Sequence, residues 1–238
     1  CMISDRERKG TSGNRVGAPK KQGLYDPQFE HDSCGVGFVV NIKGKKSHEI
    51  VRQALTILIN LRHRGACGCE SNTGDGAGIL MQMPHRFLQQ ACADVDIELP
   101  AFGHYGVGNI FLPIDEAVRQ ECERCMADVV NEEGQRFLGW RTVPTNNNGL
   151  GATARAGEPV VRQIIIGRGA SVPDEPAFER KLYVIRRRAE NAIRYAGGGD
   201  SHELYVCSLS SKTMVYKGML MSEQLEEYYP DLSDEAME

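Results

Sequence analysis

Apolar and polar positions alternate directly after the first internal cysteine of the chain, Cys34. Every second position is apolar, at Val36, Phe38, Val40 and Ile42. A period of two is typical of a β-strand, so the pattern predicts a strand with the Cys34 thiol at its start. Two interpretations of this thiol are open: a buried core cysteine, which is the commoner fate in a strand, or a nucleophile held at a strand end.

A helix is predicted to begin after Ser47. Apolar residues recur at helical spacing at Val51, Ala54, Leu55, Leu58 and Leu61. This stripe indicates a helix that packs on a sheet, with Ser47 able to cap its first turn. The helix leads into Arg62-His63-Arg64-Gly65, where backbone groups lie open to a ligand. A solvated helix end is the simpler interpretation of these arginines.

The rest of the chain alternates strand and helix patterns. Strand patterns occupy residues 79–83, 105–112, 137–143, 160–166, 203–208 and 213–216, and helical patterns lie near 115–131 and 176–195. Mixed order of this kind is typical of sheets with helices on their outer faces. Residues 1–33, by contrast, are polar, rich in glycine and without periodicity, as in a flexible leader.

Composition excludes several classes of partner. The net charge of −4 argues against a nucleic-acid partner, because phosphate binding needs clustered positive charge. No apolar run approaches the ~18 residues of a membrane-spanning helix, so no membrane partner is expected. The first residues do not resemble a secretory signal. Eight cysteines without such a signal indicate reduced thiols and a cytoplasmic location.

The remaining cysteines and glycines give weaker signals. The glycine-rich run Gly74–Gly78 is not followed by Gly-Lys-Ser/Thr or by a helix pattern, which argues against a nucleotide site. Cys67 and Cys69 have no second pair nearby at metal-binding spacing. Cys122 and Cys125 lie one turn apart on a predicted helix and are expected to share a buried face. No metal site is predicted.

Several motifs of the chain resemble a known family. They are Gly23-Leu24-Tyr25-Asp26-Pro27, Glu30-His31-Asp32-Ser33-Cys34-Gly35-Val36-Gly37-Phe38, His63-Arg64-Gly65-Ala66-Cys67-Gly68-Cys69-Glu70 and Thr73-Gly74-Asp75-Gly76-Ala77-Gly78-Ile79. They resemble the amino-terminal end of glutamate synthase large subunits. Later stretches, at Glu179–Arg187 and Tyr216–Leu220, resemble the same enzyme, so the resemblance spans residues 23 to about 230. It implies a class II glutamine amidotransferase domain.

The resemblance implies an α+β fold, the four-layer αββα sandwich of the N-terminal-nucleophile hydrolases. Members of the family are cut just before the cysteine, so residues 1–33 would be a propeptide and Cys34 the mature first residue. Residues 34–238 would be the N-terminal part of the domain, truncated at its C-terminal side. The family's oxyanion motif, His-Asn-Gly, is expected beyond Glu238, because Asn146-Asn147-Asn148-Gly149 lacks the histidine and is typical of a turn.

The implied chemistry is the hydrolysis of L-glutamine to glutamate and ammonia through a Cys34 thioester. The α-amine of Cys34, with a reference pKa of about 7.7–8, would serve as the base, so no separate histidine is needed. Arg64 matches the family's carboxylate-binding arginine, a role that suits a planar guanidinium. The resemblance also implies that Gly65, Asp75 and Gly76 bind the substrate.

The resemblance further implies what lies outside this segment. The ammonia would pass to a synthase region that makes glutamate from 2-oxoglutarate and carries FMN and an iron-sulfur cluster; no cofactor is expected in this segment. A reductase subunit or ferredoxin would supply electrons, and in a plant the location would be a plastid. This segment alone is expected to be inactive, and the alternative interpretation is a catalytically silent interaction module that keeps the shell of the fold.

Overall fold

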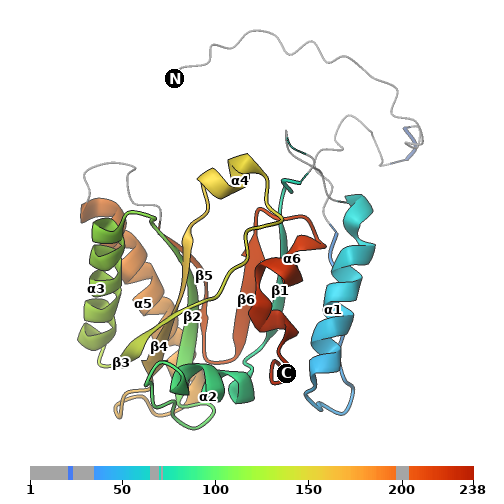
Figure 1. The fold of residues 1–238 in the computed structure, drawn as a ribbon. Coiled ribbons are helices and arrows are strands. Elements are labelled where there is room, and N and C mark those ends of the chain that lie inside the picture. Colours follow the sequence, from blue (N-terminus) through green and yellow to red (C-terminus); the bar gives the residue numbers. More distant parts are fainter. Residues whose placement is uncertain (1–20, 24–34, 65–69, 71, 197–203) are drawn as a thin grey trace. The chain divides into compact units, whose positions relative to one another are not determined.

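The computed structural model describes residues 21–23, 35–64, 70, 72–196 and 204–238. The chain divides into two units, residues 1–34 and 35–238, and the second contains all the helices and strands labelled in Figure 1. These elements form two antiparallel sheets with helices packed against them. None of the described helices is long and apolar enough to cross a membrane.

The larger sheet has four strands, in the order β3-β4-β2-β5. They are β2 (Tyr105–Leu112), β3 (Arg136–Thr142), β4 (Val160–Gly167) and β5 (Tyr205–Ser210). All neighbours are antiparallel. The central strands β2 and β4 are mostly buried, which explains why apolar residues predominate in both. Asn109 in β2 and Arg162 and Gln163 in β4 interrupt the apolar residues.

The smaller sheet pairs β1 (Ala77–Gln82) with β6 (Thr213–Gly218), again antiparallel. A tight turn at Ser211 and Lys212 joins β5 to β6 and so connects the two sheets. The Asn109 side chain of β2 donates from Nδ2 to the Val215 carbonyl of β6 at 2.8 Å. The two sheets are therefore bonded to each other as well as packed.

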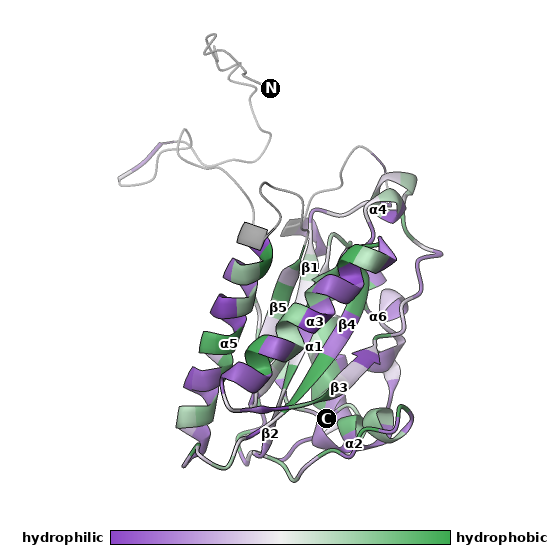
Figure 2. Cartoon of the chain, turned by 90° about the vertical axis from the view of Figure 1, so that its left-hand side faces the viewer, coloured by the Kyte–Doolittle hydropathy of each residue, from purple (hydrophilic) through white to green (hydrophobic). Residues whose placement is uncertain are grey.

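Two long helices, α3 (Glu116–Glu132) and α5 (Glu175–Ala196), pack against each other and against the four-stranded sheet (Figure 1). The buried side chains of α5 recur every three or four residues, at Phe178, Leu182, Ile185, Ala189 and Ile193. Figure 2 accordingly shows both polar and apolar colours along α5. The Asp115 side chain caps α3 by accepting from the Val118 amide at 3.0 Å.

Cys122 and Cys125 confirm the predicted shared face of α3. Cys122 is buried, and Cys125 packs against the same apolar cluster beneath α3 and α5. These two thiols are therefore part of the core.

The predicted first helix is α1 (His48–Asn60), which packs against β1. Val51 and Leu55 of the predicted stripe are buried, and Glu49 lies in the first turn. Ser47 is the N-cap residue with extended backbone, but its side chain makes no capping hydrogen bond. A short 3₁₀ turn, η2 (Arg62–Arg64), follows the helix.

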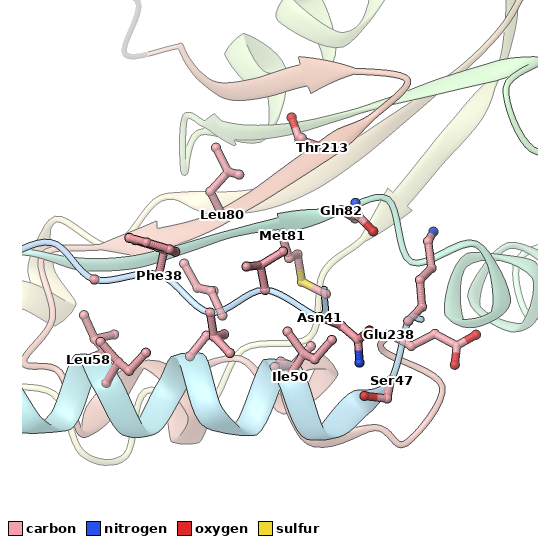
Figure 3. A pocket seen from close by; sticks show the side chains of 18 of the residues that line it. Phe38, Asn41, Ser47, Ile50, Leu58, Leu80, Met81, Gln82, Thr213 and Glu238 are labelled. Carbon is pink, nitrogen blue, oxygen red and sulfur yellow. The ribbon is translucent and has the colours of Figure 1, made fainter. Parts of the chain in front are cut away.

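The predicted strand at residues 36–42 is wrong. In the structure these residues form no strand ladder, and their apolar side chains are exposed, Val36 by 88% and Ile42 by 99%. An alternating pattern makes a strand only where a partner backbone pairs with it, and in the described part of the chain β1 pairs with β6 alone. The segment lies beside β1 and α1 without joining the sheet (Figure 3).

The short elements complete the domain. These are α2 (His85–Ala93), α4 (Ala152–Ala156), α6 (Gln224–Tyr228) and η3 (Pro230–Ser233). Residues 146–149 form the predicted asparagine-rich turn, in which the Asn148 amide donates to Asn146 Oδ1 at 3.2 Å.

Candidate active site

The predicted site residues are described to different extents. Cys34 and Gly65 lie outside the described residues. Arg64 is described by its backbone, as the last residue of η2. Asp75 and Gly76 are exposed and immediately precede β1. The end of α1 and the start of β1 lie at the same end of the domain (Figure 1).

The backbone that leads into β1 requires glycine at two positions. Gly76 has φ of +141°, a region that other residues rarely adopt. At Gly74 an added Cβ would overlap the backbone of Leu220. Glycines at these two positions therefore let the chain turn sharply into β1 and lie directly against the residues that follow β6.

Glu70 connects the chain just before this turn to α4. Its carboxylate accepts from Thr73 Oγ1 at 2.9 Å and from the Thr153 amide at 3.2 Å. These hydrogen bonds, that of Thr73 first, lower the pKa of Glu70 because they stabilise the charged form. The approach to β1 is thus bonded to a helix that lies far away in the sequence.

Gln224, on α6, was not a predicted site residue. Its Nε2 donates to the Asn72 carbonyl at 3.0 Å and to the Gly149 carbonyl at 2.9 Å. Its Oε1 accepts from the Met221 amide at 2.8 Å. No periodicity or motif in the sequence marks this glutamine, because its role depends on the backbone groups that it bonds in the folded structure.

An apolar groove of about 610 Å³ lies between α1, β1 and residues 35–47 (Figure 3). Its walls include Phe38, Ile50, Leu58 and Leu80. Its lining starts at Gly35, the residue after Cys34. Polar residues, among them Lys46, Gln82 and Glu238, also line the groove, but the predicted substrate-binding residues Asp75 and Gly76 do not.

The described cysteines are poor nucleophiles. Burial raises the pKa of Cys92 and of Cys122 to about 11 and that of Cys207 to about 12. Burial also raises the pKa of Cys125. A protonated thiol is a weak nucleophile, so at neutral pH none of these four thiols is prepared for attack.

The described residues contain no group of three or more His, Cys, Asp or Glu side chains that could hold a metal ion.

Comparison with known proteins decides the family. A sequence model described as "Glutamine amidotransferases class-II" matches residues 34–238. The chain belongs to the class II glutamine amidotransferases. The matched region of this amidotransferase begins at Cys34, the residue that the sequence pattern marked as a candidate nucleophile.

Relatives of this amidotransferase include glutamate synthases with different electron donors in their names. The NADPH glutamate synthase large chain of Bacillus subtilis is 46% identical over 218 residues, which is 92% of this chain and 14% of that protein. The NADH glutamate synthase of Saccharomyces cerevisiae is 40% identical over 230 residues, 91% of this chain and 10% of the relative. The chloroplastic ferredoxin-dependent enzyme of Oryza sativa is 40% identical over 223 residues, 92% of this chain and 13% of the relative.

These relatives confirm the resemblance read from the motifs. The chain spans only 10% to 14% of their length.

Proposed function

We propose that this amidotransferase is the glutaminase part of a glutamate synthase and hydrolyses L-glutamine to glutamate and ammonia. The observation that supports it most is the family match, which starts at Cys34 and continues to residue 238. The described thiols, whose pKa values are raised by burial, give no competing candidate. Cys34 is therefore assigned as the nucleophile.

The proposed reaction requires Cys34 to be the first residue of the mature protein, with residues 1–33 removed as a propeptide. Its free α-amine accepts the thiol proton, and the sulfur attacks the side-chain carboxamide carbon of glutamine. The C–N bond breaks, ammonia leaves with the proton returned by the α-ammonium group, and a γ-glutamyl thioester remains. Water then attacks the thioester, releasing glutamate and restoring the thiol.

Substrate binding is assigned to Arg64, Gly65, Asp75 and Gly76. The guanidinium of Arg64 would form a bidentate pair with the α-carboxylate of glutamine. Asp75 is exposed just before β1 and is available to a ligand. Hydrogen-bond donors to the oxyanion would stabilise the tetrahedral intermediate.

We further infer that the fold is the four-layer αββα sandwich of the N-terminal-nucleophile hydrolases. The helices α3 and α5, the four-stranded sheet, the β1–β6 sheet and α1 would be its successive layers. The contacts of α3 and α5 with the large sheet, of β2 with β6, and of α1 with β1 support this order.

The ammonia would serve a synthase region of the same polypeptide, which makes glutamate from 2-oxoglutarate. FMN and the iron-sulfur cluster are assigned to that region. The relatives include enzymes named for NADPH, NADH and ferredoxin, so either a reductase or ferredoxin suits as electron donor. The proposed location is the cytoplasm, or the plastid in a plant.

An electrophilic glutamine analogue, 6-diazo-5-oxo-L-norleucine, tests the assignment of Cys34. In full-length protein that begins at Cys34, peptide mass spectrometry should find the adduct on Cys34 and none on Cys92, Cys122 or Cys207. Protein that still carries residues 1–33 should remain unlabelled, because the amide nitrogen of a Ser33-Cys34 peptide is not a base. Equal labelling of Cys34 with and without residues 1–33 would contradict the mechanism. A catalytically silent module would remain unlabelled even after processing.

Arg64→Lys tests the carboxylate-binding role. A lysine keeps the positive charge but cannot form two parallel hydrogen bonds to a carboxylate. We expect the KM for glutamine in the full-length enzyme to rise about tenfold or more, which corresponds to the loss of one charge-assisted hydrogen bond of about 1.5–3 kcal/mol. Arg62→Lys, two residues earlier, is the matched control. A normal KM in Arg64→Lys with a raised KM in Arg62→Lys would move the role to Arg62.

A further inference from the structure

We propose that Gln224 is a positioning residue of the amidotransferase site. Its side-chain amide fixes the backbone of Asn72 and so holds Asp75 and Gly76 in the arrangement that binds glutamine. This inference rests on the proposed glutaminase function. We assign Gln224 no contact with the substrate. It acts only by fixing the position of residues 72–76.

All three bonds of the Gln224 amide go to backbone groups. Nε2 donates to Asn72 O and Gly149 O, at 3.0 and 2.9 Å, and Oε1 accepts from Met221 N at 2.8 Å. The side chain uses both of its amide hydrogens and its carbonyl oxygen in this way. Gln224 is only 6% exposed, so water has little access to replace a lost bond, and removal of the amide leaves these carbonyls without their partner.

Residues 72–76 lie outside the helices and the strand ladders. Apart from an isolated bridge position at Gly74, their backbone is turn, bend or irregular, and β1 begins only at Ala77. An irregular segment of this kind depends on side-chain hydrogen bonds and on packing for a fixed position. Gln224 supplies a hydrogen bond, and the close approach of Gly74 to Leu220 supplies packing.

The geometry separates the held face of residues 72–76 from their exposed face. Asn72 is bonded through its carbonyl, Gly74 is buried, and Thr73 is bonded to Glu70. Asp75 and Gly76 are exposed. The backbone near Asp75 is therefore already fixed by contacts on its buried side before a ligand binds. This reduces the conformational entropy that is lost on binding.

Gln224→Glu is the sharpest variant to test this role. A glutamate can still accept a hydrogen bond from the Met221 amide, but its carboxylate cannot donate to the carbonyls of Asn72 and Gly149. Its second carboxylate oxygen would instead face these two carbonyl oxygens. Gln224→Met removes all three bonds at similar length. Glu223→Gln, an exposed neighbour at the start of α6, is the matched control.

In the full-length processed protein, we expect Gln224→Glu and Gln224→Met to raise the KM for glutamine about tenfold, as for one lost hydrogen bond to a buried group. The kcat should change less than about threefold, because Cys34 chemistry is untouched, and Glu223→Gln should match the wild type. A fall in kcat at unchanged KM would overturn the proposal.

Amide hydrogen exchange on the full-length processed protein gives a readout that does not depend on activity. Peptides that cover residues 72–76 and 147–150 should exchange faster in both Gln224 variants, while peptides of β2 and β4 should not change. Faster exchange throughout the domain would show a merely structural role and overturn the inference. If the wild-type full-length protein releases no ammonia from glutamine, the proposed function fails, while the exchange result still decides whether Gln224 holds residues 72–76.

Discussion

Full-length, processed protein with Cys34→Ala will release ammonia from glutamine at least about 10⁴-fold more slowly than the wild type, the scale seen when a catalytic nucleophile is removed. Alanine has no atom that can form the thioester, and the thiols of Cys92, Cys122 and Cys207 cannot replace it because desolvation raises their pKa values to about 11 or 12. The measurement is ammonia production from glutamine.

The control for this variant is synthase activity supplied with free ammonia. That reaction needs no glutaminase step, so it should remain close to the wild-type rate and show that Cys34→Ala is folded. If Cys34→Ala released ammonia from glutamine at a rate close to that of the wild type, Cys34 would not be the nucleophile. The family match would then not identify the catalytic residue of this chain.

The second large effect is expected for Asp231→Ala. Asp231, on η3, forms a bidentate pair with Arg141 of β3, in which Nη1 and Nη2 each lie 2.8 Å from a carboxylate oxygen. Tyr216 of β6 donates its hydroxyl to the same carboxylate at 2.9 Å, and Gln163 of β4 accepts from Arg141 at 2.9 Å. This network joins η3 to both sheets, and both charged side chains are more than nine-tenths buried.

Removal of one partner leaves the other charge buried and unpaired, which costs about 3–5 kcal/mol. At about 2–4 °C per kcal/mol for a domain of this size, Tm should fall by about 6–20 °C. Thermal or urea unfolding of the amidotransferase domain within the full-length protein measures the effect.

Glu121→Gln is the matched control for Asp231→Ala, because it breaks an ion pair with Arg124 in which both side chains are about two-thirds exposed. Exposed pairs contribute about 0–1 kcal/mol, so its Tm should change little. An equal decrease in Tm in Asp231→Ala and Glu121→Gln would contradict the importance of burial for the Asp231 ion pair.

The sequence by itself determined the elements that depend on local periodicity. The apolar stripes of α1, α3 and α5 recur at helical spacing, and apolar residues predominate in β2 and β4. Such patterns lie within one segment and can be read without knowing the neighbours. The family could also be read from the sequence, because its motifs are contiguous runs of residues, and the comparisons confirmed it.

Tertiary structure decided whatever depends on a partner distant in the sequence. The alternating residues 36–42 carry a strand pattern, yet they form no strand in the structure because no described backbone pairs with them. Gln224 and Asp231 belong to no motif, but the Gln224 amide binds the carbonyls of Asn72 and Gly149, and the Asp231 carboxylate binds side chains of both sheets. A hydrogen bond depends on the positions of both partners, and only folding brings such distant groups within bonding distance.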